Sequence, residues 1–154
     1  MTQRFLSAVL LAAFLIVPQG GHAADCAPQG SDRQIPVLLQ ALYDGMARDD
    51  GRVWGQIVDR SFYAYDNNQR LDGNALFDQL EKAHRSGVRI VWRLDEISVH
   101  ADCASAWFSL MNRGSVGDTN GTQPMNWQES GVFAWRDGQW KLIFFHSNRV
   151  PPRS

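Results

Sequence analysis

The segment from Gln123 to Arg149 constrains the fold most, because it reads as a β-hairpin whose register can be counted from its turn. Two runs rich in aromatic and β-branched residues flank Asp137-Gly138, and Asp-Gly favours a two-residue type I′ turn with φ > 0 at both positions. If Arg136 lies opposite Gln139, the next pairs on the same face are Trp135–Trp140, Phe133–Leu142, Gly131–Phe144, Glu129–His146 and Trp127–Asn148. Side chains alternate between the faces of a strand, so these five pairs share one face of the sheet.

That face changes from apolar near the turn to polar at its far end. There the carboxylate of Glu129 lies opposite the imidazole of His146, among Trp127, Phe144 and Asn148. A carboxylate that orients an imidazole raises its basicity, which is the arrangement of a general base. The alternative is a polar cross-strand pair that fixes the register without chemistry. In either case the pattern predicts the wall of a pocket.

Residues 1–23 have the pattern of a secretory signal peptide. Arg4 precedes an apolar run over residues 5–17, which is too short to cross a bilayer as a mature helix. Gly21-His22-Ala23 then places small residues three positions and one position before a cut. We therefore expect cleavage after Ala23 and a secreted or periplasmic mature protein.

Two cysteines remain after export, Cys26 and Cys103. An oxidising compartment favours a single disulfide between them, which would attach the mature N-terminus to a turn between two strands. The alternative is two free thiols, because spacing alone does not show that the two residues meet.

Charge and motif content exclude several classes of function. The chain carries 15 basic and 16 acidic residues, a formal net charge of −1, with no basic stripe. We therefore expect neither a nucleic-acid partner nor membrane binding once the signal is removed. His84, His100 and His146 follow no metal-ligand spacing, and Walker, dinucleotide-binding and G-x-S-x-G motifs are missing. The expectation is a protein with no metal and no cofactor.

Hydrophobic periodicity predicts helices first and strands afterwards. Apolar residues recur at helical spacing over residues 32–48, again over a short stretch near residues 53–58, and over residues 72–85. Residues 61–66 form a brief aromatic strand at the edge of the sheet. From Val88 the period changes to two, and its parity breaks at Asp95-Glu96, which is typical of a β-bulge that bends a sheet. Strands at residues 104–115, 123–136 and 139–149 complete the pattern.

This order indicates one α+β domain over residues 35–151, preceded by an N-terminal segment at residues 24–34. We expect a cone-shaped α+β barrel, in which three N-terminal helices pack on a strongly curved antiparallel sheet. Such a shape leaves a conical cavity between the helices and the sheet.

The chain also resembles a known superfamily, from about Ile35 to Pro151. The stretches that carry the resemblance are ALYDGMARDDGRVWGQIVDRSFYAYD, RLDG at residues 70–73, VRIVWRLDEISV and WQESGVFAWRDGQWKLIFFHSNRVP. They resemble the nuclear transport factor 2-like (NTF2-like) superfamily, which includes ketosteroid isomerases and SnoaL-like polyketide cyclases. The His146-Ser147 pair is similar to one in the final strand of uncharacterised SnoaL-like proteins. The resemblance implies the cone-shaped fold and a homodimer, whereas the superfamily hosts many chemistries and does not imply one activity.

The resemblance carries catalytic residues over only in part. Asp66 occupies the place of the proton-shuttling base of ketosteroid isomerases, although it can equally accept hydrogen bonds in the turn at Asn67-Asn68. The oxyanion-binding tyrosine of that family aligns with Leu42, one position before Tyr43. Its protonated acid aligns with Gly131, two residues from Glu129. These departures argue against steroid-type isomerisation.

The candidate catalytic residues are therefore Glu129, His146 and Asp66. One of Asn112 and Arg113 should face the pocket, and an inward Arg113 would favour a carboxylate ligand. The full set of expected pocket residues is Tyr43, Trp54, Tyr65, Trp92, Trp127, Phe144, Asn148, Asn112 and Arg113.

Three functions fit these observations. The first is an exported protein that binds a small hydrophobic or carboxylate-bearing molecule in an apolar pocket without turnover. The second is a cofactor-independent isomerase, cyclase or dehydratase with His146–Glu129 or Asp66 as its general base. The third is an assembly module that dimerises.

Overall fold

The computed structural model describes residues 26–27 and 30–151, so the predicted signal peptide lies outside the described residues. The helices are α1 (Ser31–Ala47), α2 (Gly51–Ile57) and α3 (Ala75–Arg85). The strands are β1 (Val58–Asp66), β2 (Gln69–Asp72), β3 (Arg89–Val91), β4 (Leu94–Ala101), β5 (Ser105–Asp118), β6 (Gly121–Arg136) and β7 (Gln139–Val150). None of these helices is long and apolar enough to cross a membrane.

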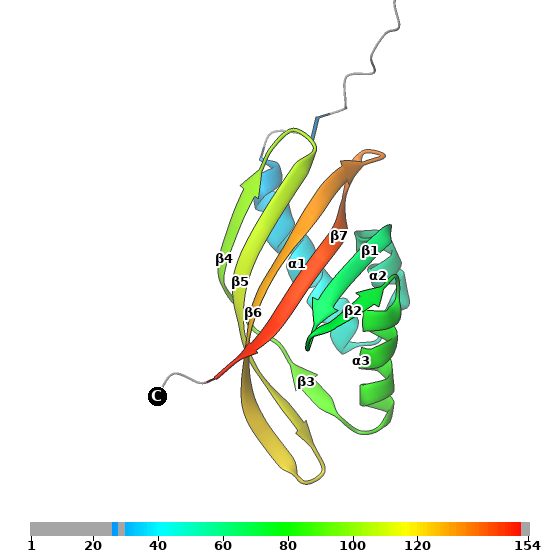
Figure 1. Ribbon diagram of the computed structural model, residues 1–154, viewed down its shortest axis with the longest axis vertical. Helices are drawn as coiled ribbons and strands as arrows, with labels where there is room; N and C mark the ends of the chain where they lie inside the picture. Colours follow the sequence, from blue (N-terminus) through cyan, green and yellow to red (C-terminus); the bar gives the residue numbers. More distant parts are fainter. Residues whose placement is uncertain (1–25, 28–29, 152–154) are drawn as a thin grey trace, which may run out of the picture.

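The three helices cover one face of a curved sheet (Figure 1). The apolar stripe of α1, made by Ile35, Leu39 and Leu42, faces the core, where these side chains are at most 4% exposed. From the sheet, Phe108 and Phe133 pack in the same cluster. The core therefore lies between α1 and the concave face, and burial of these large apolar side chains stabilises that contact.

The seven strands form one mixed sheet in the order β2-β1-β7-β6-β5-β3, with β4 also pairing with β5. The predicted α+β class and the three helices are confirmed, but the sheet is not closed into a barrel. It is also not antiparallel throughout, because β1 runs parallel to β7. Strand β1 is not at the edge, since the segment after it folds back as β2 and takes that place.

The predicted bulge in β4 is confirmed. The register of β4 on β5 shifts between Asp95 and Ser98, and Glu96 has a φ of 51°. In the same region the chain leaves the sheet briefly between β3 and β4, at Trp92 and Arg93. This irregular segment lets the two short strands follow different parts of the long strand β5.

The predicted hairpin turn is confirmed, but the register counted from it holds for only half of the hairpin. Asp137 and Gly138 have φ of 51° and 77°, and Trp135–Trp140 and Phe133–Leu142 pair as expected. A bulge then leaves Ile143 without an opposite residue, so that Val132 pairs with Phe144. Beyond it the observed pairs are Gly131–Phe145, Ser130–His146, Glu129–Ser147, Gln128–Asn148 and Trp127–Arg149.

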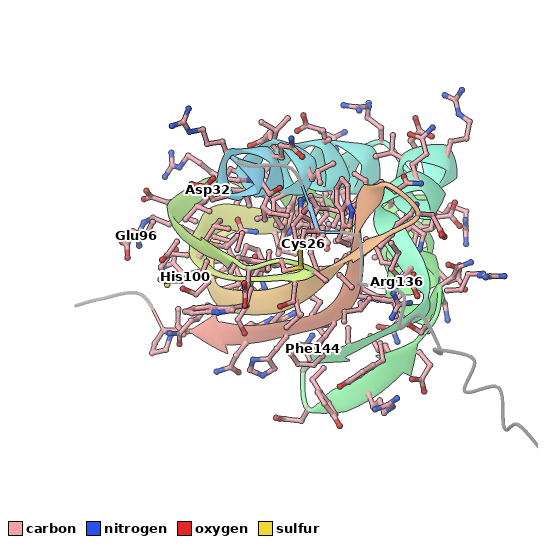
Figure 2. The ribbon with its side chains drawn as sticks, turned by 90° about the horizontal axis from the view of Figure 1, so that it is seen from above. Cys26, Asp32, Glu96, His100, Arg136 and Phe144 are labelled. Carbon is pink, nitrogen blue, oxygen red and sulfur yellow. A yellow bond between two sulfur atoms is a disulfide. The ribbon has the colours of Figure 1, made fainter. Side chains whose placement is uncertain are left out.

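The predicted disulfide between Cys26 and Cys103 is present. It joins the segment before α1 to the turn between β4 and β5 (Figure 2). The backbone N–H of Ala27 also donates to the carbonyl oxygen of Cys103 at 2.7 Å. The N-terminal segment is therefore held to the sheet by a covalent bond and a hydrogen bond.

Candidate functional site

A cavity of about 260 Å³ lies between the helices and one end of the sheet. Its apolar lining comprises Met46, Leu76, Leu80, Ala83, Val88, Ile90, Trp92, Val116, Trp127 and Phe145. Its polar lining comprises Tyr43, Asp66, Asn67, Gln79, Glu129, Ser147 and Arg149. An apolar enclosure with a few convergent polar groups is the usual composition of a small-molecule site.

Glu129 is the centre of the polar part of the lining and is only 4% exposed. The hydroxyl of Tyr43, from α1, donates to Oε2 at 2.5 Å. The Nδ2 of Asn112, from β5, donates to the same oxygen at 3.3 Å. The hydroxyl of Ser147, from β7, donates to Oε1 at 3.3 Å. Three neutral donors from three elements thus surround one buried carboxyl group.

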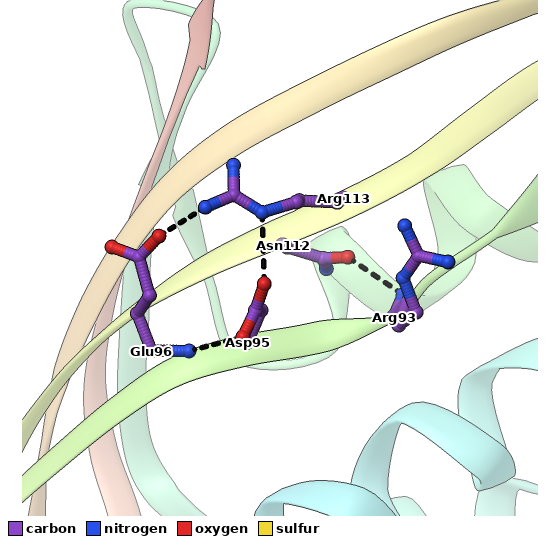
Figure 3. A network of polar contacts seen from close by, with 5 residues as sticks. All are labelled: Arg93, Asp95, Glu96, Asn112 and Arg113. Carbon is purple, nitrogen blue, oxygen red and sulfur yellow. Dashed lines mark hydrogen bonds and ion pairs between the residues drawn. The ribbon is translucent and has the colours of Figure 1, made fainter.

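The orientation of Asn112 is fixed from its other side. Its Oδ1 accepts the backbone N–H of Arg93 at 3.0 Å (Figure 3). Arg93 lies in the irregular segment between β3 and β4, and its carbonyl accepts the N–H of Arg113 at 2.9 Å. Since Oδ1 is engaged with an N–H donor, the amide must present its NH₂ group to Glu129.

Burial decides the protonation of this cluster. It raises the pKa of Glu129 from 4.5 to about 7, although hydrogen bonds from Tyr43, Asn112 and Ser147 oppose the shift, and the charge of Asp66 adds to it. Burial, followed by the charge of Glu129, also raises the pKa of Tyr43 well above 10. Near pH 7 the tyrosine is therefore a neutral donor, and the glutamate exists in both protonation states.

Asp66 lines the cavity from the last position of β1, opposite Ser147 of β7. It is half-buried, and the Nδ2 of Asn67 donates to it at 2.7 Å. Burial raises its pKa above 3.8, against the opposing effects of Asn67 and the positive charge of Arg149. The predicted hydrogen bond in the turn is present, and the side chain also lines the cavity, so that its use as a base stays a prediction.

The predicted pairing of Glu129 with His146 is wrong. His146 pairs with Ser130, its side chain is exposed, and it does not line the cavity. The cause is the bulge at Ile143, because one extra residue moves every later side chain of β7 to the opposite face. Ser147 takes the position that had been assigned to His146, which removes the reason to regard the histidine as a general base.

The same bulge moves two predicted pocket residues out of the site. Phe144 lies on the sheet face away from α1, where its ring contacts those of Tyr63 and Tyr65 at centroid distances of 5.1 and 6.3 Å (Figure 2). Tyr65 therefore belongs to the outer face too. Asn148 is exposed and lies opposite Gln128, away from the cavity.

Two more predicted pocket residues lie elsewhere. Trp54 is buried in the core, where its Nε1 donates to Asn74 at 2.9 Å and its ring contacts that of Phe77. Arg113 points outward and pairs with Asp95 at 2.9 Å and with Glu96 (Figure 3). The inward residue of the Asn112–Arg113 pair is therefore Asn112, which reaches the cavity through Glu129.

Of the residues expected at the site, five line the cavity, namely Tyr43, Trp92, Trp127, Asp66 and Glu129. Sequence reasoning missed Ser147, Arg149, Phe145 and the α3 face made by Leu76, Leu80 and Ala83. The helical stripe of α3 was visible in the sequence, but it was interpreted only as core. The β7 residues were missed because the bulge leaves no distinct sequence signal.

No group of three or more histidine, cysteine or acidic residues able to hold a metal ion occurs in the described part of the chain. The cavity itself holds two carboxyl groups, Asp66 and Glu129, and one guanidinium, Arg149. These groups can bind a small ligand or transfer a proton.

Comparison with known proteins gives the fold. No family model matches the chain, and no curated protein matches it. Among solved structures, an NTF2-like protein of unknown function from Pseudomonas putida is 20% identical, with a TM-score of 0.66, over 79% of this chain and 88% of its own. A Streptomyces avermitilis protein, described only provisionally as a dehydratase of the NTF2-like family, is 15% identical, with a TM-score of 0.69, over 79% of this chain and 97% of its own.

A CaMKII hub from S. rosetta is similar to the same extent. It is 17% identical, with a TM-score of 0.69, over 80% of this chain and 100% of its own. The predicted NTF2-like fold is therefore confirmed, while identities this low say nothing about shared activity.

Proposed function

We propose that this chain, which has the NTF2-like fold, is an exported protein that binds a small, mainly apolar molecule in the cavity between α1, α3 and the sheet. One observation carries the proposal. The cavity is lined mainly by apolar side chains, and its polar groups gather around Glu129 and Asp66. The apolar body of a ligand would contact Trp92 and Trp127, while its polar end would reach the two carboxyl groups. The disulfide is consistent with the export that the sequence predicts.

The size of the cavity supports a small ligand. Sites for drug-sized molecules usually have volumes of roughly 300–1,000 Å³, and this cavity, at about 260 Å³, lies just below that range. The expected ligand therefore has one ring or a short chain.

The lining does not favour the carboxylate-bearing ligand that the sequence also allowed. That expectation depended on an inward Arg113, and Arg113 points outward. The cavity instead presents two carboxyl groups and only one cation, Arg149. Like charges in a partly desolvated site repel, so a neutral or cationic polar end is preferred.

Ligand-induced thermal stabilisation tests this proposal. A library of small apolar fragments should contain compounds that raise Tm, because binding only to the folded state stabilises it. Ala83→Leu, which fills part of the cavity from α3, should abolish that rise, whereas Val37→Ala, at an exposed position of α1 outside the cavity, should leave it unchanged. A library without any stabilising compound, or hits that act equally on Ala83→Leu, would contradict binding in this cavity.

Catalysis is the alternative use of the same cavity. It now depends on Asp66 as the proton-abstracting base, since it is half-buried, lines the cavity and has a raised pKa. The two uses differ in what happens to a bound hit. Recovery of every hit unchanged after prolonged incubation supports binding, and conversion that Asp66→Asn abolishes supports catalysis.

A row of side chains across the outer sheet face favours dimerisation as a second function. His100, Trp107, Val132, Phe144 and Tyr63 are successive cross-strand neighbours on β4, β5, β6, β7 and β1. Trp107 is 52% exposed, although its ring stacks on that of His100. Exposed apolar surface of this kind marks interaction sites, and the similar structures include a CaMKII hub.

Light scattering after gel filtration tests the dimer. The wild type should elute as a dimer, and Trp107→Glu as a monomer, because a charge at the centre of an apolar interface is left unpaired. Val37→Glu is the matched control, since Val37 is an exposed apolar residue on α1. A monomeric wild type at tens of micromolar would refute this assignment without affecting the cavity.

A further inference from the structure

The hydrogen bonds around Glu129 favour a ligand that donates rather than one that accepts. A carboxylate offers about four lone-pair positions. Oε2 accepts from both Tyr43 and Asn112, whereas Oε1 accepts only from Ser147. One acceptor position on Oε1 is therefore left for a group that enters the cavity.

Every one of these donors is neutral. Within residues 26–27 and 30–151, Glu129 makes no ion pair with a lysine, arginine or histidine. Removing an ionised carboxylate from water is costly unless a cation pairs with it. The site thus supplies hydrogen-bond donors to the anionic form of Glu129 but no positive charge to pair with it.

Ser147 lies between the two carboxyl groups of the cavity, those of Asp66 and Glu129. It is the cross-strand neighbour of Glu129 on one side and of Asp66 on the other. Asp66 and Glu129 consequently lie on adjacent parts of the same cavity lining. Among the described residues that line the cavity, Arg149 carries the one positive charge, and its side chain is exposed.

The aromatic side chains of the cavity suit the same kind of ligand. Trp92, Trp127 and Tyr43 line it, and the rings of Tyr43 and Trp92 meet edge to face at 5.7 Å. The face of an indole ring attracts cations electrostatically, most strongly where water is excluded. Aromatic and carboxylate groups together favour a positively charged nitrogen on an apolar body.

We infer that the ligand of this cavity is a small apolar amine, bound as its ammonium ion with the nitrogen between Asp66 and Glu129. This inference rests on the proposed function, because it specifies the molecule that the cavity binds. The ammonium group supplies the missing counter-charge and donates to the open position on Oε1. Its hydrocarbon part lies against Trp92 and Trp127.

Binding of a cation has a consequence for protons. Glu129 has a pKa of about 7, so near that pH it is about half protonated when the cavity is empty. The groups that face it are Tyr43 from α1, Asp66 from β1, Asn112 from β5 and Ser147 from β7. An ammonium ion favours the ionised form, so binding at pH 7 should release about half a proton from Glu129.

The test uses matched probes that differ only in charge. Three sets of an amine, an alcohol and a carboxylic acid, built on benzyl, phenethyl and n-hexyl groups, are titrated into the oxidised protein by calorimetry at pH 7. In at least one set the amine should bind tenfold or more tightly than its alcohol, and the acid should bind least. The enthalpy should change between phosphate and Tris buffers in proportion to the released proton.

Two variants locate the effect. Glu129→Gln should weaken amine binding at least tenfold, abolish the buffer dependence and leave alcohol binding within threefold. Val37→Ala should behave as wild type, because Val37 is exposed on α1 and belongs neither to the cavity nor to the outer-face row. If Glu129→Gln does not fold, the order of affinities among the amine, the alcohol and the acid of each set decides instead. Alcohols or acids that bind as tightly as the amines would overturn the inference and leave the proposed function standing. If none of the nine probes binds and the fragment library gives no hit, the proposed function fails as well.

Discussion

Among single residues, Glu129 has the largest effect on the charge of the cavity and therefore on which ligands it can bind. It is buried by the packing of α1 against the sheet, yet every donor around it favours the charged form. Burial and hydrogen bonding therefore act in opposite directions, and burial dominates, so that the pKa of Glu129 reaches about 7. Because its pKa lies near neutral pH, Glu129 changes its protonation state when a bound molecule adds or removes one nearby charge.

This balance predicts how stability depends on pH. Since the pKa of Glu129 in the folded protein, about 7, exceeds its ordinary value of 4.5, the protonated side chain contributes stability that is fully present below pH 4.5 and is lost as pH rises through about 7. Glu129→Gln cannot ionise. Between pH 4.5 and 8 the wild type should therefore lose about 3 kcal/mol of unfolding free energy relative to this variant, as measured by denaturant titration at both pH values.

Gln128→Ala is the control for that experiment, because Gln128 is an exposed neighbour of Glu129 on β6 and carries no ionisable group. It should keep the wild-type dependence between the same two pH values. Parallel stability curves for the wild type and Glu129→Gln would show that Glu129 does not titrate in this range.

The position of a single residue could be predicted where a short stretch of sequence determines on which face of its helix or strand the side chain lies. Tyr43 follows from the helical stripe of α1, and Trp127 was expected in the wall and is found there. His146 was misplaced because its face depends on counting through Ile143, where a bulge shifts the register by one residue. An apolar run such as Leu-Ile-Phe-Phe can face either way, so its sequence carries no signal for the extra residue.

Among the secondary-structure elements, the β6–β7 hairpin positions the polar part of the cavity. Its bulge places Ser147 beside Glu129, and Gly131 lies next to that bulge, opposite Phe145. A Cβ atom at Gly131 would come within 2.6 Å of the carbonyl oxygen of Phe144 and 2.7 Å of the Phe108 ring. The hairpin thus approaches its neighbours so closely that only glycine fits.

We therefore expect Gly131→Ala to be destabilising. Backbone and a core ring would both have to move, which for overpacking costs about 1–3 kcal/mol. The matched control is Gly55→Ala, in the exposed part of α2, where nothing lies within 4 Å of the added atom. Because alanine is favoured over glycine in a helix, Gly55→Ala should raise Tm slightly. A Tm for Gly131→Ala equal to that of wild type would mean that the hairpin adapts its register.

Most elements could be predicted because their signals are local. The three helices, the Asp137-Gly138 turn and the bulge at Asp95-Glu96 each follow from a short stretch of sequence. The parallel pairing of β1 with β7 could not be predicted in this way, since it joins segments far apart in the chain without a turn between them. That pairing matters for function, because it brings Asp66 beside Ser147.

At the scale of the whole molecule, the disulfide and the cavity lie at opposite ends of the sheet. Cys103 lies in the turn between β4 and β5, and Cys26, which is bonded to it, precedes α1. This turn lies at the end of the sheet opposite β3 (Figure 1). The cavity is lined at the other end, by Val88, Ile90 and Val116 near β3. The two features are thus structurally separate, and stability and binding should respond independently to loss of the disulfide.

Reduction of Cys26–Cys103 should accordingly lower stability and spare the cavity. The bond closes a loop with a sequence separation of 77 residues, for which the lost constraint on the unfolded chain corresponds to about 4.5 kcal/mol. The unfolding free energy in denaturant should fall by this amount on adding a reductant to the wild type. The Cys26→Ser/Cys103→Ser variant should match the reduced wild type and not respond to reductant.

Affinity for a cavity ligand should stay within twofold at temperatures where both forms are folded. A weaker affinity that accompanies the loss of the bond would mean that α1, which carries Tyr43, shifts when its N-terminal end is released, and that the two ends of the sheet are coupled through this helix.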